Sequence, residues 1–212
     1  FRYEYNKHAI RLMNHTGRIY TQAYGAENLP KDGGYVMFAN HQGKYDALGI
    51  MLTHEEPCSV VMDEARSKMP LVKQFIDMVG GKRLCLHDLR QAARVIREVS
   101  KEVEYGRKYI IFPAGGYSHR NGNHVDVFKA GSFKSAMRAK APIVPVALVD
   151  SWKVFDLWSL RKVNTQVYYL KPIPYEEYRD MKSVEVAKLV YDRITAAIAY
   201  AEKHHPEIAV IQ

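Results

Sequence analysis

Short apolar runs alternate with stretches of helical periodicity along most of this 212-residue chain, and this alternation restricts its fold more than any other feature. The pattern predicts strands at residues 35–39, 58–62, 83–86, 108–112, 143–149 and 167–170. It predicts helices after Asp46 and over residues 70–79, 89–105, 132–140 and 183–203. Because the strand segments are apolar almost throughout, both faces of the sheet should be covered. The sequence therefore predicts an α/β fold with a largely parallel central sheet flanked by helices.

The first 24 residues have a mixed character. Apolar residues recur there at roughly helical spacing with basic residues between them: Ala9, Leu12, Met13, Tyr20 and Ala23, with Arg2, Lys7, Arg11 and Arg18. Two interpretations stay open, a helix packed on the domain, which we favour, and a basic amphipathic helix at a membrane surface. We therefore divide the chain into an N-terminal amphipathic helix, residues 1–30, and a main domain, residues 31–212.

Composition narrows the possible partners. Lys and Arg number 31 against 23 Asp and Glu, so the net charge is +8, which suits a polyanionic partner such as an anionic membrane or a phosphorylated small molecule. No recognition motif for nucleic acid accompanies this charge, so we expect no nucleic-acid partner. Two cysteines are consistent with a reducing compartment. No apolar stretch reaches the ~20 residues that span a bilayer, and because the chain begins at Phe1, a removed N-terminal anchor stays open.

Polar residues follow the first predicted strand. His41 stands just past its end, and Asp46 opens a helix five positions later. On one continuous helix this spacing is a rotation of about 500°, so the two side chains can meet only if His41 lies in a turn. Asp46 could then hold one imidazole nitrogen and leave the other as a base. The spacing alone favours a simpler alternative, an N-capping Asp beside a solvated His. The rest of the sequence, described below, makes us prefer the His–Asp pair.

A second loop leaves the strand at residues 108–112 and runs through Pro113, Ala114, Gly115, Gly116 and Ser118. In parallel sheets the ligand site lies at the carboxyl ends of the strands. This loop and His41 both follow such ends. They should therefore face the same site.

Four stretches, in order between about Gly33 and Val149, resemble the glycerolipid acyltransferase family, and within it the enzymes that acylate 1-acylglycerol-3-phosphate. They correspond to the family patterns Asn-His-x4-Asp, Phe-Pro-Glu-Gly with a Ser shortly after, Phe-Lys-x-Gly, and Pro-Ile-Val-Pro-Val. The matching residues are Asn40, His41 and Asp46; Phe112, Pro113, Gly115 and Ser118; Phe128, Lys129, Gly131 and Ala136; and residues 142–146.

The resemblance implies a phospholipid-synthesising acyltransferase whose domain spans residues 31–212. His41 would be the general base on the free hydroxyl of a lysophospholipid, and Asp46 would hold its tautomer. The acyl group would come from acyl-CoA or acyl carrier protein as co-substrate, with no cofactor, no metal and no acyl-enzyme. The glycine-rich loop would approach the acceptor. The enzyme would work at the cytoplasmic face of the cell membrane, held peripherally or through a removed N-terminal segment. A Ser hydrolase is disfavoured because the chain has no Gly-x-Ser-x-Gly motif.

Departures from the family pattern concern the acceptor site. Ala114 stands where the family has a Glu, and residues 86–87 stand where it has an Arg. We therefore expect the phosphate contacts to fall to other basic residues: Lys44, Lys82, Arg83 or Arg120. The acceptor loop itself would be Phe112, Pro113, Ala114, Gly115, Gly116 and Ser118.

Ala114 leaves several interpretations open. The chain could be a natural member with another lysolipid acceptor, or a catalytically inactive relative that binds lipid. It could also be an engineered Glu→Ala form, and because every flanking residue fits the family, we favour an engineered or weakened enzyme.

Overall fold

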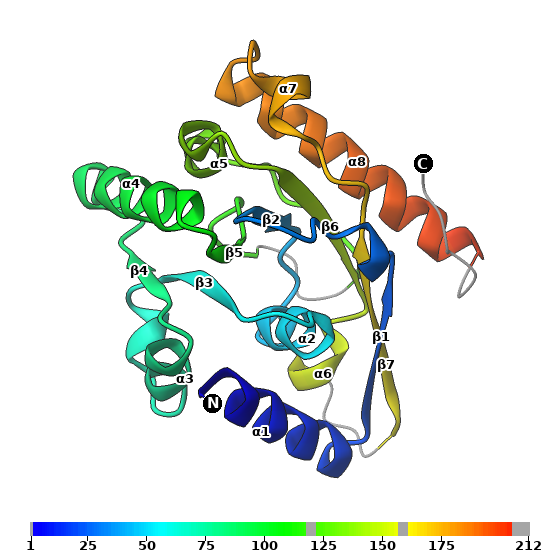
Figure 1. The fold of residues 1–212 in the computed structure, drawn as a ribbon. Coiled ribbons are helices and arrows are strands. Elements are labelled where there is room, and N and C mark those ends of the chain that lie inside the picture. The colour runs from blue at the N-terminus through cyan, green and yellow to red at the C-terminus, as the bar shows by residue number, and fades with distance from the viewer. Residues whose placement is uncertain (1, 118–121, 157–160, 205–212) are drawn as a thin grey trace.

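A computed structural model describes residues 2–117, 122–156 and 161–204 (Figure 1). Its strands form one seven-stranded sheet in the order β1-β7-β6-β2-β5-β3-β4. Their bounds are β1 Ile19–Tyr24, β2 Val36–Ala39, β3 Cys58–Asp63, β4 Lys82–Leu84, β5 Lys108–Ile111, β6 Ile143–Val149 and β7 Val163–Tyr169. Every neighbouring pair is parallel except β6 and β7. The predicted largely parallel sheet is confirmed, with β1 and β7 running against the other five strands.

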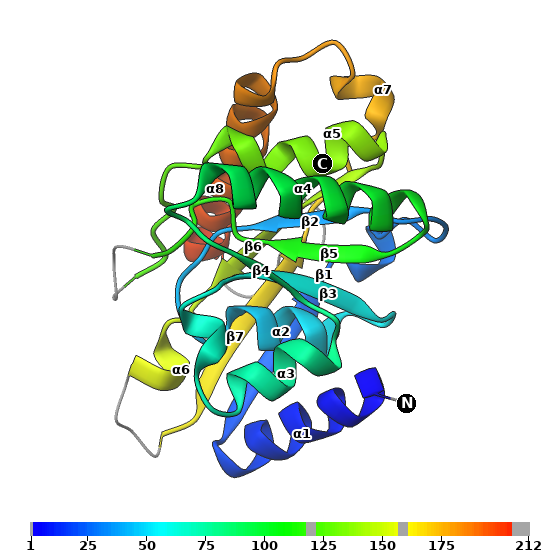
Figure 2. The same cartoon turned by 90° about the vertical axis from the view of Figure 1, so that its left-hand side faces the viewer.

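Helices cover both faces of this sheet (Figures 1 and 2). One face carries α1 Arg2–Thr16, α2 Asp46–Thr53 and α3 Val72–Met78, and the other carries α4 Leu89–Glu104, α5 Lys134–Ala139 and α8 Ser183–His204. The short helices are α6 Lys153–Asp156 and α7 Tyr175–Tyr178, with 3-10 turns at Ala26–Asn28, Arg66–Lys68 and Ala130–Phe133. Among the described residues, no helix has both the length and the apolar character needed to cross a membrane.

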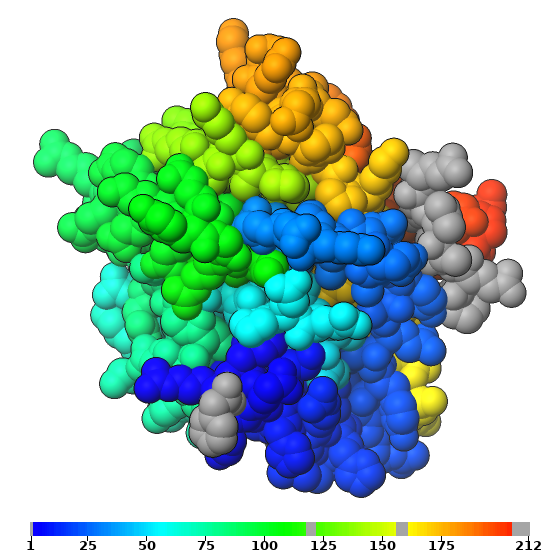
Figure 3. All heavy atoms as spheres, in the orientation of Figure 1, coloured from blue at the N-terminus to red at the C-terminus, as the bar shows by residue number. Residues whose placement is uncertain are grey.

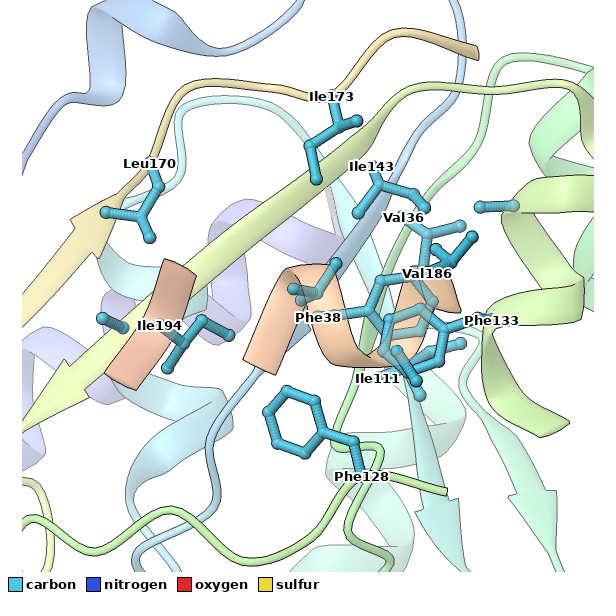
Figure 4. Packing of buried hydrophobic residues seen from close by; sticks show 14 of the residues in the cluster. Val36, Phe38, Ile111, Phe128, Phe133, Ile143, Leu170, Ile173, Val186 and Ile194 are labelled. Atoms are coloured by element: carbon cyan, nitrogen blue, oxygen red, sulfur yellow. The ribbon is translucent and has the colours of Figure 1, made fainter. Parts of the chain in front are cut away.

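The central strand β2 shows why its sequence is apolar throughout. Val36 and Phe38 pack in the core on the α4 and α8 side, whereas Met37 and Ala39 pack on the α1 and α2 side. Figure 4 shows the first of these cores, where the Phe38 ring stacks on Phe133 with ring centroids 4.1 Å apart. Successive side chains of a strand point to opposite faces, so a strand covered on both faces needs apolar residues at every position.

The N-terminal prediction was wrong in one respect. Helix α1 ends at Thr16, and Tyr20 and Ala23 lie on β1, which pairs with β7. Arg18, with φ of 53°, turns the chain out of the helix. Helix α1 packs against α2 and α3, so the packed-helix interpretation is confirmed; association of residues 1–30 with a membrane stays a prediction.

Several other predicted boundaries shift. Strand β4 begins at Lys82 and ends at Leu84, β7 begins at Val163, and the helix predicted over 132–140 begins as a 3-10 turn before α5. The start of α4 is as its sequence indicates. The Asp88 carboxylate caps it by accepting hydrogen bonds from the backbone N–H groups of Arg90 and Gln91.

Candidate active site

The two loops expected to form the site do meet at one edge of the sheet. β2 and β5 are neighbouring parallel strands, with Phe38 opposite Ile111. His41 therefore emerges beside Phe112, and the two rings stack with centroids 4.5 Å apart.

His41 and Asp46 form the close pair that their spacing allowed. The imidazole Nδ1 lies 2.6 Å from the Asp46 carboxylate Oδ2. A carboxylate can only accept a hydrogen bond, so the proton is on Nδ1 and Nε2 is the basic nitrogen. Nε2 has no hydrogen-bond partner among the described residues. The His41 side chain keeps 17% of its surface exposed, whereas Asp46 keeps 1%.

Asp46 does not cap the helix that it opens. Its Oδ2 also accepts hydrogen bonds from the backbone N–H groups of Gln42 at 2.6 Å and Gly43 at 3.0 Å, and its Oδ1 accepts from the Ser151 hydroxyl at 2.5 Å. The capping alternative is therefore wrong. The carboxylate instead folds the preceding turn around itself and fixes the position of His41.

Ser151 was missed by the sequence-based prediction. It follows β6, which neighbours β2 in the sheet, so its hydroxyl reaches the same edge as His41. The signal available in the sequence was its place just after a predicted strand. Strand order, which sequence did not provide, was needed to use it.

The turn that carries His41 is tied to β6 by side chains on either side of it. Asn40 accepts a hydrogen bond from the Leu148 N–H at 2.7 Å and donates one to the Leu148 carbonyl at 3.0 Å. Gln42 accepts from the Ser151 N–H at 3.0 Å and donates to Asn123 at 2.9 Å. The turn of His41 is thus fixed on both sides by hydrogen bonds to the segment of β6 and its following loop, which is the kind of positioning that a preorganised site requires.

Aromatic rings enclose His41 on two sides. Besides Phe112, Tyr117 meets the imidazole edge-on, with ring centroids 4.8 Å apart and planes at 80°. The Arg66 guanidinium lies over the Tyr117 ring, 5.1 Å from its centroid. Arg66, which the sequence did not single out, forms no ion pair with a described residue. Through Tyr117 it brings a cation close to the His41 ring.

The glycine-rich loop follows β5 and passes under Lys129. Gly115 has φ of +77°, a backbone conformation that favours glycine. A Cβ there would lie 3.0 Å from the Lys129 ammonium, so this cation rests on the loop. The Lys129 N–H also donates to the Pro113 carbonyl at 3.0 Å. Ala114 is half-buried, and Gly116 has open space at its Cα.

The basic residues predicted to bind the acceptor phosphate do not lie together at this loop. Lys44 is exposed. On the edge strand β4, Lys82 pairs with Glu102 at 2.6 Å, and Arg83 pairs with Asp77 at 2.6 Å. Burial would raise the pKa of Glu102, but hydrogen bonds from Lys82 and Tyr109 outweigh it and lower that pKa. Ser118 and Arg120 lie outside the described residues.

Comparisons with known proteins show which family the sequence belongs to. The sequence matches the Acyltransferase family over residues 21–149. It is similar to the 1-acyl-sn-glycerol-3-phosphate acyltransferases of Borreliella burgdorferi (28% identity over 131 residues, 62% of this chain and 52% of that protein) and Saccharomyces cerevisiae (27% over 190 residues, 88% and 61%). The chain thus spans between about half and three-fifths of the length of these relatives.

The fold has a solved counterpart. The crystal structure of the 1-acyl-sn-glycerophosphate acyltransferase PlsC from Thermotoga maritima superposes with a TM-score of 0.74 at 20% identity, covering 98% of this chain and 85% of that one. The sheet with helices on both faces is therefore the fold of that protein. Since the family match covers more than half of the sequence and includes the loop of His41 and Asp46, this chain belongs to the Acyltransferase family.

Proposed function

We propose that this protein transfers a fatty acyl group from acyl-CoA or acyl carrier protein to the free hydroxyl of a lysophospholipid such as 1-acylglycerol-3-phosphate. The observation that carries the proposal is the His41–Asp46 pair, in which the carboxylate orients the imidazole and Nε2 is left for a substrate. The names of the relatives agree with this substrate class.

In the proposed reaction, Nε2 of His41 takes the proton of the acceptor hydroxyl while the oxygen attacks the thioester carbonyl carbon. Asp46 stabilises the imidazolium that forms. The tetrahedral intermediate then collapses, the carbon–sulfur bond breaks, and the leaving thiolate takes the proton from His41. A general base of this kind contributes about 10²–10⁴-fold to the rate.

Direct transfer fits the surroundings of Cys58. Cys58 is buried on the α1 side of the sheet, and burial raises the pKa of its thiol to about 12. It is therefore protonated at neutral pH and a poor nucleophile. The thioester is already activated, so the proposed reaction needs no cofactor and no metal.

We propose that the phosphate of the acceptor is bound by two basic residues close to His41, Arg66 and Lys129. Arg66 and Lys129 contact Tyr117 and Gly115, and neither pairs with a described carboxylate. Lys44 is exposed in the His41 turn and could add a third contact. Lys82 and Arg83 would first have to leave Glu102 and Asp77, which makes them weaker candidates.

Ala114 supports a second candidate function, an inactive lipid-binding relative. A Glu at this position would lie one residue before Gly115, within reach of the Lys129 ammonium. It could orient acceptor hydroxyls, and misplacement by about 1 Å can cost roughly 10²-fold. We therefore expect Ala114→Glu to raise kcat/KM for the acceptor, with little change in donor affinity.

Product analysis by mass spectrometry tests both candidates. The chain and its Ala114→Glu variant should be compared on a panel of lysolipids, each with acyl-CoA and with acyl carrier protein. A diacylglycerol-3-phosphate product from 1-acylglycerol-3-phosphate supports the proposal. Lipid binding without any product from either form would favour the inactive relative. We further propose that the enzyme works at the cytoplasmic membrane face, held peripherally or by an N-terminal segment.

A further inference from the structure

A cavity of about 380 Å³ lies away from the His41 site, between the end of α1, the strand β1 and the start of β7. We propose that it binds the anionic headgroup of a membrane phospholipid. Figure 2 shows α1 running below the sheet beside β1, and Figure 3 shows both elements on the lower surface of the molecule. The site does not depend on acyl transfer, since it would hold the protein on the membrane whatever reaction follows.

The charge of the lining points to an anion. Arg11 and His15 lie one turn apart on α1, and Lys162 approaches from the start of β7. The Lys162 ammonium lies over the Tyr20 ring, 4.2 Å from its centroid. No Asp or Glu is among the described lining residues, and none of the three basic side chains pairs with a described carboxylate. An anionic group entering the cavity would meet cations from two separate elements.

The size and rim of the cavity favour a lipid headgroup as the source of that anion. Ligand sites for small molecules commonly measure about 300–1,000 Å³, and Gln22 and Asn164 add polar groups for a headgroup hydroxyl or ester. Tyr20, which lines the cavity, is exposed by 52%, and Leu12, the neighbour of Arg11 on α1, is exposed by 60%. Apolar side chains next to basic ones are typical of surfaces that lie at the membrane interface.

Two residues that line the cavity, Asn14 and Thr21, form hydrogen bonds with Tyr45, the residue before α2. The Asn14 amide donates to the Tyr45 hydroxyl at 2.6 Å, and Tyr45 also shares a hydrogen bond of 2.6 Å with Thr21. Tyr45 directly precedes Asp46. A headgroup held between α1 and β1 would therefore fix the protein on the membrane through the elements that also position the His41–Asp46 pair.

Vesicle co-sedimentation tests the site on the whole chain. The probes are phosphatidylcholine vesicles with and without phosphatidylglycerol. The site variant is Arg11→Gln with Lys162→Gln, both at exposed positions, and the control is Arg94→Gln with Arg97→Gln on the exposed face of α4, which removes the same charge elsewhere. Each basic residue at an anionic surface strengthens binding about fivefold, so the site variant, which lacks two, should bind phosphatidylglycerol vesicles about thirtyfold more weakly.

The control variant distinguishes binding by the cavity residues from binding through the net charge of the protein. Retained binding in the Arg94/Arg97 variant with loss in the Arg11/Lys162 variant supports the headgroup site. Equal losses in the two variants would show that net charge alone drives binding, and no loss in the Arg11/Lys162 variant would show that the cavity takes no headgroup; either result overturns the proposal. Thermal melts of both variants confirm that each is folded.

Discussion

A histidine lies on each side of α2, His41 in the turn before the helix and His54 directly after it, and their surroundings differ in one decisive respect. At the N-terminal end, His41 Nδ1 bonds the Asp46 carboxylate, and Nε2 has no partner among the described residues. At the C-terminal end, His54 Nδ1 lies 2.6 Å from the Glu56 carbonyl, and Nε2 lies 2.6 Å from the Tyr35 hydroxyl. A carbonyl only accepts, so His54 also carries its proton on Nδ1, and Tyr35 donates to Nε2.

The same tautomer thus serves two purposes. In His54 both ring nitrogens are used by the protein, the residue is 1% exposed, and burial lowers its pKa. In His41 one nitrogen is used and the other is available to a substrate. A histidine beside a good hydrogen-bond acceptor is therefore a candidate base only when its second nitrogen is unused.

The largest expected effect is on turnover at the first end. His41→Ala removes the base, so kcat should fall by about 10²–10⁴-fold or more. Because the side chain is partly exposed and tied mainly to Asp46, the melting temperature should stay close to that of the parent. Steady-state kinetics and thermal melts measured together decide between a catalytic and a structural role for His41. Full turnover in the variant would end the catalytic assignment, and a large drop in melting temperature would favour a structural one.

For His54, after the C-terminal end of α2, we expect the opposite result: a loss of stability without a loss of turnover. His54→Ala leaves the buried Tyr35 hydroxyl without its acceptor and opens a cavity, so the free energy of unfolding should fall by roughly 2–4 kcal/mol. Turnover per folded molecule should be unchanged. Denaturant unfolding checks the first expectation, with His8→Ala at an exposed position as the control. A stable but inactive His54 variant would erase the contrast between the two ends.

A smaller effect is expected from Ser151, which acts on the base only through Asp46. Ser151→Ala removes the hydrogen bond to Oδ1, while the two backbone bonds and the His41 bond to Oδ2 remain. Hydrogen bonds to charged groups are worth about 1.5–3 kcal/mol; because Ser151 acts only through Asp46, we expect the lower end of this range, a fall in kcat of about tenfold. A positioning role predicts unchanged KM values for both substrates. If KM rises and kcat does not change, Ser151 contacts a substrate instead.

Sequence alone predicted the first end of α2 better than the second. His41 and Asp46 lie five residues apart in a turn whose geometry is constrained locally, and the family pattern identifies both. His54 gave no such signal. Its hydrogen-bonded surroundings come from distant parts of the sequence: Tyr35 donates to its ring, and the Lys7 ammonium on α1 donates to its carbonyl at 2.9 Å.

The same limit explains the other differences. Periodicity predicted most strands and helices, and apolar runs predicted the covered sheet. It could not predict β1, because a strand that pairs with β7, more than 130 residues later, has no local signature. Arg66 follows β3 and Ser151 follows β6, and both lie at the site only because of the order of the strands in the sheet. The basic cavity likewise lies between α1 and the start of β7, which are far apart in the sequence. Each of these depends on contacts between distant segments.

The smallest predicted effect uses the lowered pKa of His54. Burial, its largest cause, keeps the folded pKa below the ordinary value near 6.5. The unfolded chain therefore binds a proton more readily than the folded one, so this residue stabilises the fold above about pH 6.5, and that contribution is lost as the pH falls toward the folded pKa. Melting temperatures measured from about pH 7.5 down to about pH 5 should fall more steeply for the parent than for His54→Gln, which cannot titrate. The exposed His8→Gln variant should follow the parent. Parallel curves for the parent and His54→Gln would show that His54 is not held neutral, and the contrast between the two ends of α2 would then rest on hydrogen bonding alone.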